Sequence, residues 1–198
     1  MTAPTSTTSI KPVRKAVFPV AGLGTRLLPA TKVMPKEMLT IVDRPLIQMA
    51  VEEAMAAGVT EFIFVISEGK ETLLRHFETP ASMMEMLELR GKTKEIQKVK
   101  ESTLPQGALK TALQPKALGL GHAVWCAREI VGNEPFAVLL PDDTVRHPVG
   151  CLSQMISAYN LVGGNVVAAV AVNPEETSKY GILDVVSRDG RNLSLRGL

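Results

Sequence analysis

A glycine-containing loop near the start of the chain carries the first residues whose types and spacing could do chemistry. It runs from Pro19 to Arg26 with the sequence PVAGLGTR. Gly22 and Gly24 let backbone N–H groups approach a ligand with no Cβ in the way, and such amides can form a nest for phosphate oxygens. The guanidinium of Arg26 is a planar fork that suits phosphate, and Lys36 follows in the next segment. This pattern is typical of an anion-binding loop.

The residues of this loop leave a second interpretation open. Two glycines after a strand also make an ordinary tight turn, and Lys36 can be a solvated surface lysine. The loop is not the dinucleotide-binding fingerprint, because Leu27 stands where the third glycine belongs. It is not a Walker A loop either, because no Gly-Lys-Ser/Thr closes it.

A pair of carboxylates, Asp142 and Asp143, directly follows the apolar run Phe136–Leu140. Adjacent carboxylates repel each other, and nothing in the local sequence neutralises them. Mg²⁺ takes oxygen ligands and typically uses one or two carboxylates together with substrate phosphates. One of the two side chains could therefore hold a metal while the other faces a second ligand. A plain Asp-Asp turn is the alternative.

Gln114 is a third candidate, because its side-chain amide can donate and accept at once, as the imide edge of uracil requires. It precedes Pro115 and the stretch Gly119–Gly121, where Gly119 leaves room for a flat ring. An exposed loop glutamine is the alternative. We interpret His122, at the start of the next helical segment, as a capping or packing residue.

Apolar runs that alternate with helix-forming segments must position these residues. Val13–Val20 and Glu61–Ser67 have the composition of buried strands, and Pro45–Ala57 between them has helical spacing that Gly58 would end. This order predicts a βαβ unit. The residues expected on one face of the helix are Leu46, Met49, Ala50, Glu53 and Ala57.

The rest of the chain continues this alternation. The expected elements are two or three helices in 70–101, an extended segment 104–115, a helix 121–131, a third buried strand 136–140, a helix 151–161, a fourth buried strand 165–172, and two short exposed strands at 182–186 and 193–196. Continuous apolar strands between helices indicate an α/β fold with a mainly parallel sheet covered on both faces. Ligands bind at the carboxyl ends of such strands, which are the loops after Val20 and Leu140.

Composition excludes several classes of protein. The 198 residues are 45% hydrophobic, 21% charged and 4% aromatic, with a net charge of +2, so neither nucleic acid nor a membrane is an expected partner. The cysteines, Cys126 and Cys151, form no disulfide framework, which fits a reducing cytosol. We predict a cytoplasmic protein with a disordered tail over residues 1–12 and one domain over residues 13–198.

Three segments together resemble the nucleotide-binding signature of the sugar-nucleotide pyrophosphorylases: Ala21–Arg26, Pro35–Leu39 and Asp43–Gln48. The sequences of the second segment and of Gly119–Ala123 resemble those of the bacterial UTP–glucose-1-phosphate uridylyltransferases. The similarity extends from about Val13 to the end of the chain. It implies a Rossmann-like three-layer sandwich with a mainly parallel mixed sheet, of the nucleotide-diphospho-sugar transferase type.

The resemblance also implies residue roles. Arg26 would contact the triphosphate and Lys36 would steady phosphate charge during transfer. Asp142 would bind the metal, and Asp143 and Gly181 would border the sugar. The nucleotide-binding residues implied are Ala21, Gly22, Gly24, Thr25, Glu37, Gln114 and Gly119. Leu113 stands where relatives often carry arginine.

The activity implied is the transfer of UMP from UTP to glucose 1-phosphate, which gives UDP-glucose and pyrophosphate with Mg²⁺ as cofactor, in a homo-oligomer (dimer or tetramer). The family carries a Glu-Lys-Pro motif and a further aspartate downstream of the position of Leu198. We therefore expect a domain incomplete at its C-terminus that is poorly active alone. Two alternatives stay open: a nucleotidyltransferase of the same fold with another base or sugar, and a non-catalytic nucleotide-binding module.

Overall fold

The computed structural model describes residues 10–197. The chain divides into two compact units, Met1–Ser153 and Gln154–Leu198, and each is described by itself. Most of the tail predicted over residues 1–12 lies outside the described residues, and residues 10–12 are exposed without regular structure. No helix within residues 10–197 combines the length and the apolar character needed to cross a membrane.

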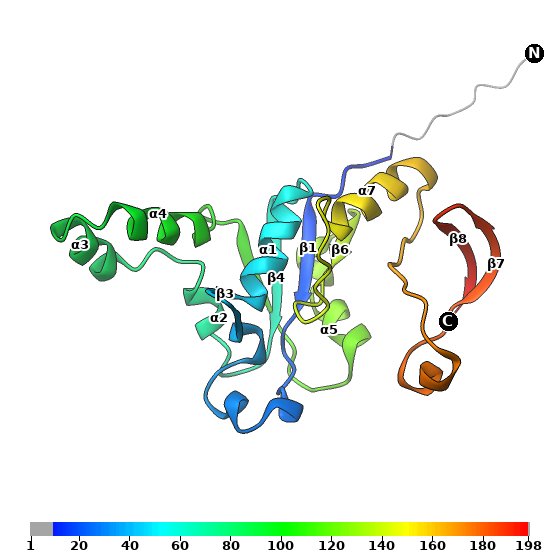
Figure 1. Ribbon diagram of the computed structural model, residues 1–198, viewed down its shortest axis with the longest axis horizontal. Coiled ribbons are helices and arrows are strands. Elements are labelled where there is room, and N and C mark those ends of the chain that lie inside the picture. The colour runs from blue at the N-terminus through cyan, green and yellow to red at the C-terminus, as the bar shows by residue number, and fades with distance from the viewer. Residues whose placement is uncertain (1–9, 198) are drawn as a thin grey trace, which may run out of the picture. The chain divides into compact units, whose positions relative to one another are not determined.

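A four-stranded parallel sheet forms the centre of the first unit (Figure 1). Its strands are β1 (Lys15–Pro19), β4 (Glu61–Ile66), β5 (Leu109–Leu113) and β6 (Phe136–Val138), in the order β5-β4-β1-β6. Three of them are the predicted apolar strands, and β5 lies in the segment predicted to be extended. This is the Rossmann-like α/β fold that the sequence predicts.

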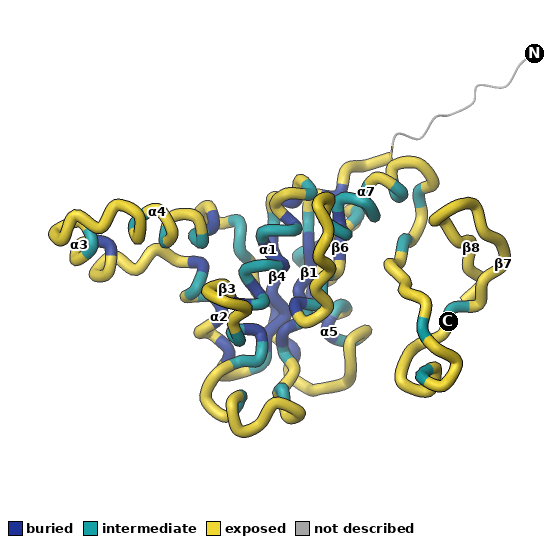
Figure 2. Tube along the Cα trace, in the orientation of Figure 1, coloured by how far each residue is buried: buried dark blue, intermediate teal, exposed yellow. Residues whose placement is uncertain are grey.

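The register of the sheet separates two apolar faces. Phe18 pairs with Phe64 across β1 and β4, and Val17 pairs with Ile63; because residues alternate along a strand, these two pairs face opposite sides. On one face Phe64 packs edge-on against Phe18 at a centroid distance of 5.4 Å and against Phe77 at 5.5 Å. The other face packs against the helices before β6, with the cluster Val17, Ile63, Val65, Ala112, Ala123, Ala127 and Val131. Figure 2 shows the buried residues concentrated along β1 and β4.

The order in which the chain adds strands to the sheet reverses at β1, although all four strands are parallel. From β1 the chain passes through α1 (Leu46–Ala56) to β4 on one side, whereas from β5 it passes through α5 (Leu120–Cys126) and α6 (Arg128–Val131) to β6 on the other side of β1. Crossovers between parallel strands are right-handed, so α1 and α5 cover opposite faces of the sheet. The point between β1 and β6 is therefore the topological switch point, where open α/β sheets bind ligands.

Helix α1 buries a different face from the one predicted. The buried residues are Ile47, Ala50, Val51 and Ala54, of which the predicted face included only Ala50. The observed spacing gives an entirely apolar stripe, whereas the predicted face contained the charged Glu53. The Oε1 of Glu53 instead accepts a hydrogen bond from the backbone N–H of Leu152 at 2.8 Å.

The remaining elements of the first unit are short. Three helices occupy the predicted helical region, α2 (Thr72–Arg75), α3 (Ala81–Leu89) and α4 (Thr93–Ser102), and Figure 1 shows the last two projecting from the sheet. Between β1 and α1 lie three 3₁₀ turns and a two-stranded ribbon: η1 (Thr25–Leu27), η2 (Ala30–Lys32), η3 (Lys36–Met38), β2 (Thr40–Ile41) and β3 (Arg44–Pro45). The single helix predicted over 121–131 is divided at Ala127 into α5 and α6.

Helix α7 (Cys151–Val162) begins in the first unit and continues into the second. The second unit also contains η4 (Pro174–Lys179) and an antiparallel hairpin of β7 (Asp184–Asp189) and β8 (Asn192–Gly197), close to the two predicted exposed strands. The prediction of a fourth buried strand at 165–172 is wrong, because this segment is largely exposed and has no regular structure. A strand needs a hydrogen-bonded neighbour, and no described strand pairs with this segment.

Candidate functional site at the switch point of the sheet

The loop after β1 folds back on the segment that carries Lys36. Val20 continues the strand and donates its N–H to the carbonyl of Val65 at 2.9 Å. Gly24 has φ of 64°, and a Cβ there would lie 3.2 Å from the Cβ of Lys36 and 3.2 Å from the Cγ2 of Thr31. The backbone angle therefore favours glycine, and a Cβ would fit only if the side chains of Lys36 and Thr31 moved by a few tenths of an ångström. The hydroxyl of Thr31 donates to the carbonyl of Gly24 at 2.8 Å and so links the glycine loop to the segment that follows it.

The side chain of Arg26 is available at this loop. Arg26 lies in η1 next to Thr25, and both residues are exposed. Within residues 10–197 the guanidinium of Arg26 has no hydrogen-bond or ion-pair partner. Its five N–H groups can therefore bind an incoming anion without first breaking a contact.

Lys36 and Asp142 meet across the switch point. The Nζ of Lys36, in η3, lies 2.6 Å from the Oδ2 of Asp142, in the loop after β6, and the two side chains are 25% and 52% exposed. Partial burial raises the pKa of Asp142, but the hydrogen bond from Lys36 and the attraction of its charge outweigh burial and hold that pKa below its usual value. The two loops indicated by the sequence are thus joined by a charge-assisted hydrogen bond.

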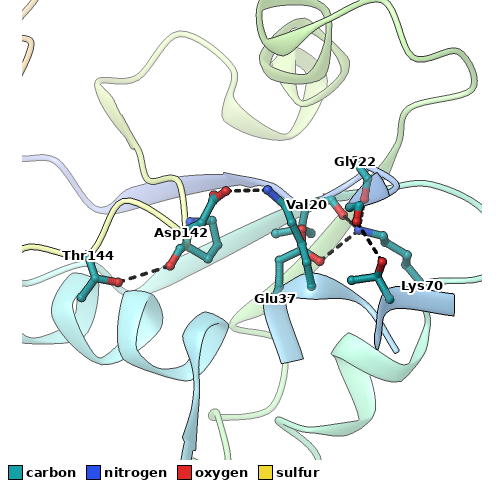
Figure 3. Close-up of polar contacts among 10 residues, drawn as sticks. Val20, Gly22, Glu37, Lys70, Asp142 and Thr144 are labelled. Atoms are coloured by element: carbon teal, nitrogen blue, oxygen red, sulfur yellow. Dashed lines mark hydrogen bonds and ion pairs between the residues drawn. The ribbon is translucent and has the colours of Figure 1, made fainter. Parts of the chain in front are cut away.

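The two adjacent carboxylates have different surroundings. Asp142 faces Lys36, whereas the exposed side chain of Asp143 has no partner within the described part of the chain. Two hydrogen bonds hold this turn. The N–H of Asp143 donates to the carbonyl of Leu140 at 3.0 Å, and the hydroxyl of Thr144 donates to the carbonyl of Pro141 at 3.4 Å (Figure 3). Asp143 can therefore contact a ligand other than the one held by Asp142.

The donor set at this point fits a metal that substrate helps to hold. Among residues 10–197, no three His, Cys, Asp or Glu side chains gather in a way that could bind a metal ion. A single carboxylate, that of Asp142, is a hard oxygen ligand and suits Mg²⁺ that is bound mainly through phosphate and water. It does not suit a metal caged by protein ligands alone.

Lys70 is a residue of this site that the sequence analysis missed. Its Nζ donates to the carbonyl oxygens of Val20 and Gly22, each at 2.5 Å, and to the Oε2 of Glu37 at 3.0 Å (Figure 3). Lys70 follows β4 in the segment Ser67–Lys70, so the rule that singled out the loops after β1 and β6 applied to this loop as well.

Glu37 reaches the same loop from its inner side. Its side chain is 1% exposed, and that of Lys70 is 9% exposed. The second carboxylate oxygen of Glu37, Oε1, is buried and has no hydrogen-bond partner among the described residues. Glu37 is thus placed to neutralise the ammonium of Lys70, while its role in nucleotide binding stays a prediction.

Gln114 is held with its amide in one orientation. Its backbone N–H donates to the carbonyl of Ile66 at 2.8 Å, and its Nε2 donates to the carbonyl of Gly119 at 3.1 Å and lies 3.1 Å from the Nδ1 of His122. With the ring proton of His122 on Nε2, Nδ1 accepts that bond, and both amide hydrogens of Gln114 are used. The Oε1 of Gln114 then remains to accept a hydrogen bond from a ligand.

Gly181 lies in the second unit, between η4 and β7, and is exposed. Its assignment to the sugar side therefore stays a prediction, as does that of Asp143. In the first unit, the structure brings together Arg26, Lys36 and Asp142 with the glycine loop, and it adds Lys70.

The chain is similar to known proteins. The profile described as "Nucleotidyl transferase" matches residues 15–193. The chain is 48% identical over 189 residues to the UTP–glucose-1-phosphate uridylyltransferase of Komagataeibacter xylinus, covering 96% of this chain and 66% of that protein.

Solved structures agree with this match. The UTP-bound UGPase from Acinetobacter baumannii superposes with a TM-score of 0.87 at 39% identity, covering 93% of this chain and 66% of that one. A UDP-glucose pyrophosphorylase complexed with UDP-glucose gives 0.77 at 38% identity, covering 93% and 67%. The chain thus spans just under two-thirds of the relatives first named here, 66% in each case.

Proposed function

Because this chain belongs to the nucleotidyl transferase family, we propose that its protein transfers UMP from UTP to glucose 1-phosphate, giving UDP-glucose and pyrophosphate. The observation that carries the proposal is the meeting of a glycine loop, Arg26, Lys36 and Asp142 at the switch point of a parallel sheet. The names of the relatives, one of them solved with UTP and another with UDP-glucose, supply the nucleotide and the sugar.

The residues of the first unit would bind the triphosphate by charge and by backbone donors. Arg26 has its guanidinium exposed at the loop. Lys36 shares its charge with Asp142 at 2.6 Å, and a phosphate with a greater negative charge would compete for that ammonium. Binding would therefore exchange one ion pair for another without leaving Lys36 unpaired.

The chemical step needs no general base from the protein. A phosphate monoester has a second pKa of about 6, so glucose 1-phosphate is largely dianionic near neutrality. One of its oxygens attacks the α-phosphorus of UTP, the bond from that phosphorus to the bridging oxygen breaks, and pyrophosphate leaves with the electron pair. Arg26 and Lys36 would align the phosphates and stabilise the negative charge on their oxygens. Mg²⁺ held by Asp142 would neutralise further phosphate charge.

The orientation of Gln114 supports an imide base. Because its Nε2 is occupied by Gly119 and His122, the free Oε1 would accept the N3–H of uracil. Cytosine has an acceptor at that position, so it would face Oε1 with no proton between them. Thymine shares the imide edge, and nucleotide competition separates the uridylyl from the thymidylyl alternative.

Calorimetric titration of the chain with UTP, dTTP, CTP and ATP in the presence of Mg²⁺ tests the nucleotide assignment. We expect UTP to bind most tightly. A coupled assay for pyrophosphate, run on the complete gene product, tests the reaction and should require both UTP and glucose 1-phosphate. Equal affinity for ATP and UTP would contradict the assigned base, and UTP binding without pyrophosphate release would favour a non-catalytic module.

A further inference from the structure

The ammonium group of Lys70 uses all three of its hydrogen-bond donors on the loop after β1 and on η3. It has three N–H donors and three acceptors, the carbonyls of Val20 and Gly22 and the carboxylate of Glu37. With its side chain 9% exposed, Lys70 has no donor left for a ligand. Whatever it does for nucleotide binding must act through the groups it holds.

The two carbonyls held by Lys70 fix the direction of two backbone donors. In a planar trans peptide the C=O and the N–H point in opposite directions. When the carbonyl of Val20 points at Lys70, the N–H of Ala21 points away from it, and the same relation links the carbonyl of Gly22 to the N–H of Leu23. Within residues 10–197 neither of these N–H groups has a hydrogen-bond partner, and Gly22 and Leu23 are exposed.

We propose that Lys70 is a positioning residue that orders the glycine loop, so that the N–H groups of Ala21 and Leu23 are presented together to the nucleotide. This inference rests on the nucleotide binding proposed above. Glu37 is the counter-charge that allows a lysine to stay buried at this place. Glu37 lies next to Lys36 in η3. The contact between Lys70 and Glu37 therefore also fixes η3, and Lys36 with it, relative to the glycine loop.

An ion pair that only stabilised the fold would not affect the order of the glycine loop. A buried pair often contributes little net stability, and an apolar pair of similar volume can replace it. An apolar side chain cannot bind the carbonyls of Val20 and Gly22, however. Replacing the pair therefore separates the two roles: packing can survive the exchange, whereas the order of the loop cannot.

The test compares three variants with the wild-type chain. Lys70→Met alone would leave the carboxylate of Glu37 buried and unpaired, which is strongly destabilising. Glu37→Gln keeps an amide oxygen that can accept from the ammonium of Lys70, beside the carbonyls of Val20 and Gly22. Lys70→Met is therefore made in a Glu37→Gln background and compared with Glu37→Gln alone, whose own melting temperature shows the cost of the lost counter-charge. The double variant Lys110→Met/Glu61→Gln is the matched control, because it removes an ion pair of 2.6 Å between β4 and β5 that has no contact with the loop. Melting temperature, the Kd for UTP, and backbone ¹⁵N order parameters of residues 21–24 without nucleotide are measured for each.

We expect the step from Glu37→Gln to Glu37→Gln/Lys70→Met to weaken UTP binding by at least about tenfold, since hydrogen bonds to charged groups are individually worth that much. The order parameters of residues 21–24 should fall in the same step, and the control should keep the wild-type affinity. A folded Glu37→Gln/Lys70→Met variant with the affinity and order parameters of Glu37→Gln would overturn the proposal.

The outcome is separable from that of the proposed function. If the wild-type chain bound no nucleoside triphosphate, the proposed function would fail at that step. The order parameters need no ligand, so they would still decide whether Lys70 orders the loop: a fall on its replacement supports that role, and no change refutes it.

Discussion

The substitution Asp142→Asn tests the centre of the site, and its effect on stability should be small. It removes the ion pair with Lys36, whose atoms lie 2.6 Å apart but whose side chains are 25% and 52% exposed. Exposed pairs of this kind contribute about 0.2–1 kcal/mol, because solvent screens them. For a domain of this size, that corresponds to a fall in melting temperature of no more than about 4 °C.

The pH dependence of that difference has a defined sign. Burial raises the pKa of Asp142, but the hydrogen bond and charge of Lys36 lower it further, so the folded pKa lies below the unfolded value, which is about 3.9. The stabilisation is therefore complete above the unfolded pKa and is lost as the pH falls through the folded one. The wild-type chain and Asp142→Asn should differ equally at pH 6 and pH 8 and converge in acid.

Nucleotide binding should respond far more strongly than stability. We expect Mg²⁺ to strengthen UTP binding to the wild-type chain relative to the same titration in EDTA. The coupling should be within the common range of about 5–150-fold. Asp142→Asn should lose most of this enhancement, because an amide oxygen is a weaker ligand than a carboxylate for a hard cation. Asp143→Asn is the matched comparison and should keep the enhancement, since the resemblance places that side chain toward the sugar.

Two results would refute this reasoning. An equal effect of Mg²⁺ on UTP binding in Asp142→Asn and in the wild-type chain would remove Asp142 from the metal site. A loss of melting temperature well beyond 4 °C would show that the pair with Lys36 is part of the folded core, against its exposure of 25% and 52%.

Three further predictions follow from the same geometry. Lys36→Ala and Arg26→Ala in the complete gene product should each slow turnover by the equivalent of about 2.7–4 kcal/mol with little change in melting temperature, and near-normal turnover in a pyrophosphate assay would exclude the altered residue from catalysis. Gln114→Ala should reduce the preference for UTP over ATP, because a site loses discrimination with its hydrogen-bonding partner; unchanged discrimination by calorimetry would exclude Gln114 from the base site. Phe64→Ala should lower the free energy of unfolding in urea by about 3–5 kcal/mol, since Phe64 is fully buried between two aromatic rings, and a loss below 1 kcal/mol would contradict that packing.

The strands of the sheet could be predicted because burial on both faces leaves a simple record in the sequence. β1 and β4 are inner strands, and each reads as a run of apolar residues with no polar alternation. The same signal failed at 165–172, which is equally apolar but has no strand beside it in the described structure. An apolar run shows that a segment could form a buried strand. Whether it does so depends on a neighbouring strand to pair with, and the run itself carries no information about that neighbour.

The site was predictable where several residues formed one pattern and not where one residue acted alone. Gly22, Gly24 and Arg26 stand together, and Asp142 and Asp143 are adjacent at the end of a strand. Lys70 is a single lysine in a turn, and its importance comes from the carbonyls of Val20 and Gly22, which lie 50 and 48 positions earlier in the chain. Every residue has a backbone carbonyl, so the amino-acid types at these positions do not show that their carbonyls bind Lys70.

The reversal of strand order explains why these separate loops form one site. A parallel sheet brings all of its carboxyl ends to one edge, and the switch point is where ligands bind at that edge. Because the chain leaves β1 toward one face and enters β6 from the other, β1 and β6 lie side by side although the chain between them passes through β4 and β5. Lys36 and Asp142 meet where the loops after these two strands lie next to each other, while Lys70, from the loop after β4, binds two carbonyls of the glycine loop. The site thus depends on three consecutive strands of the sheet, β4, β1 and β6, each of which contributes the loop at its carboxyl end.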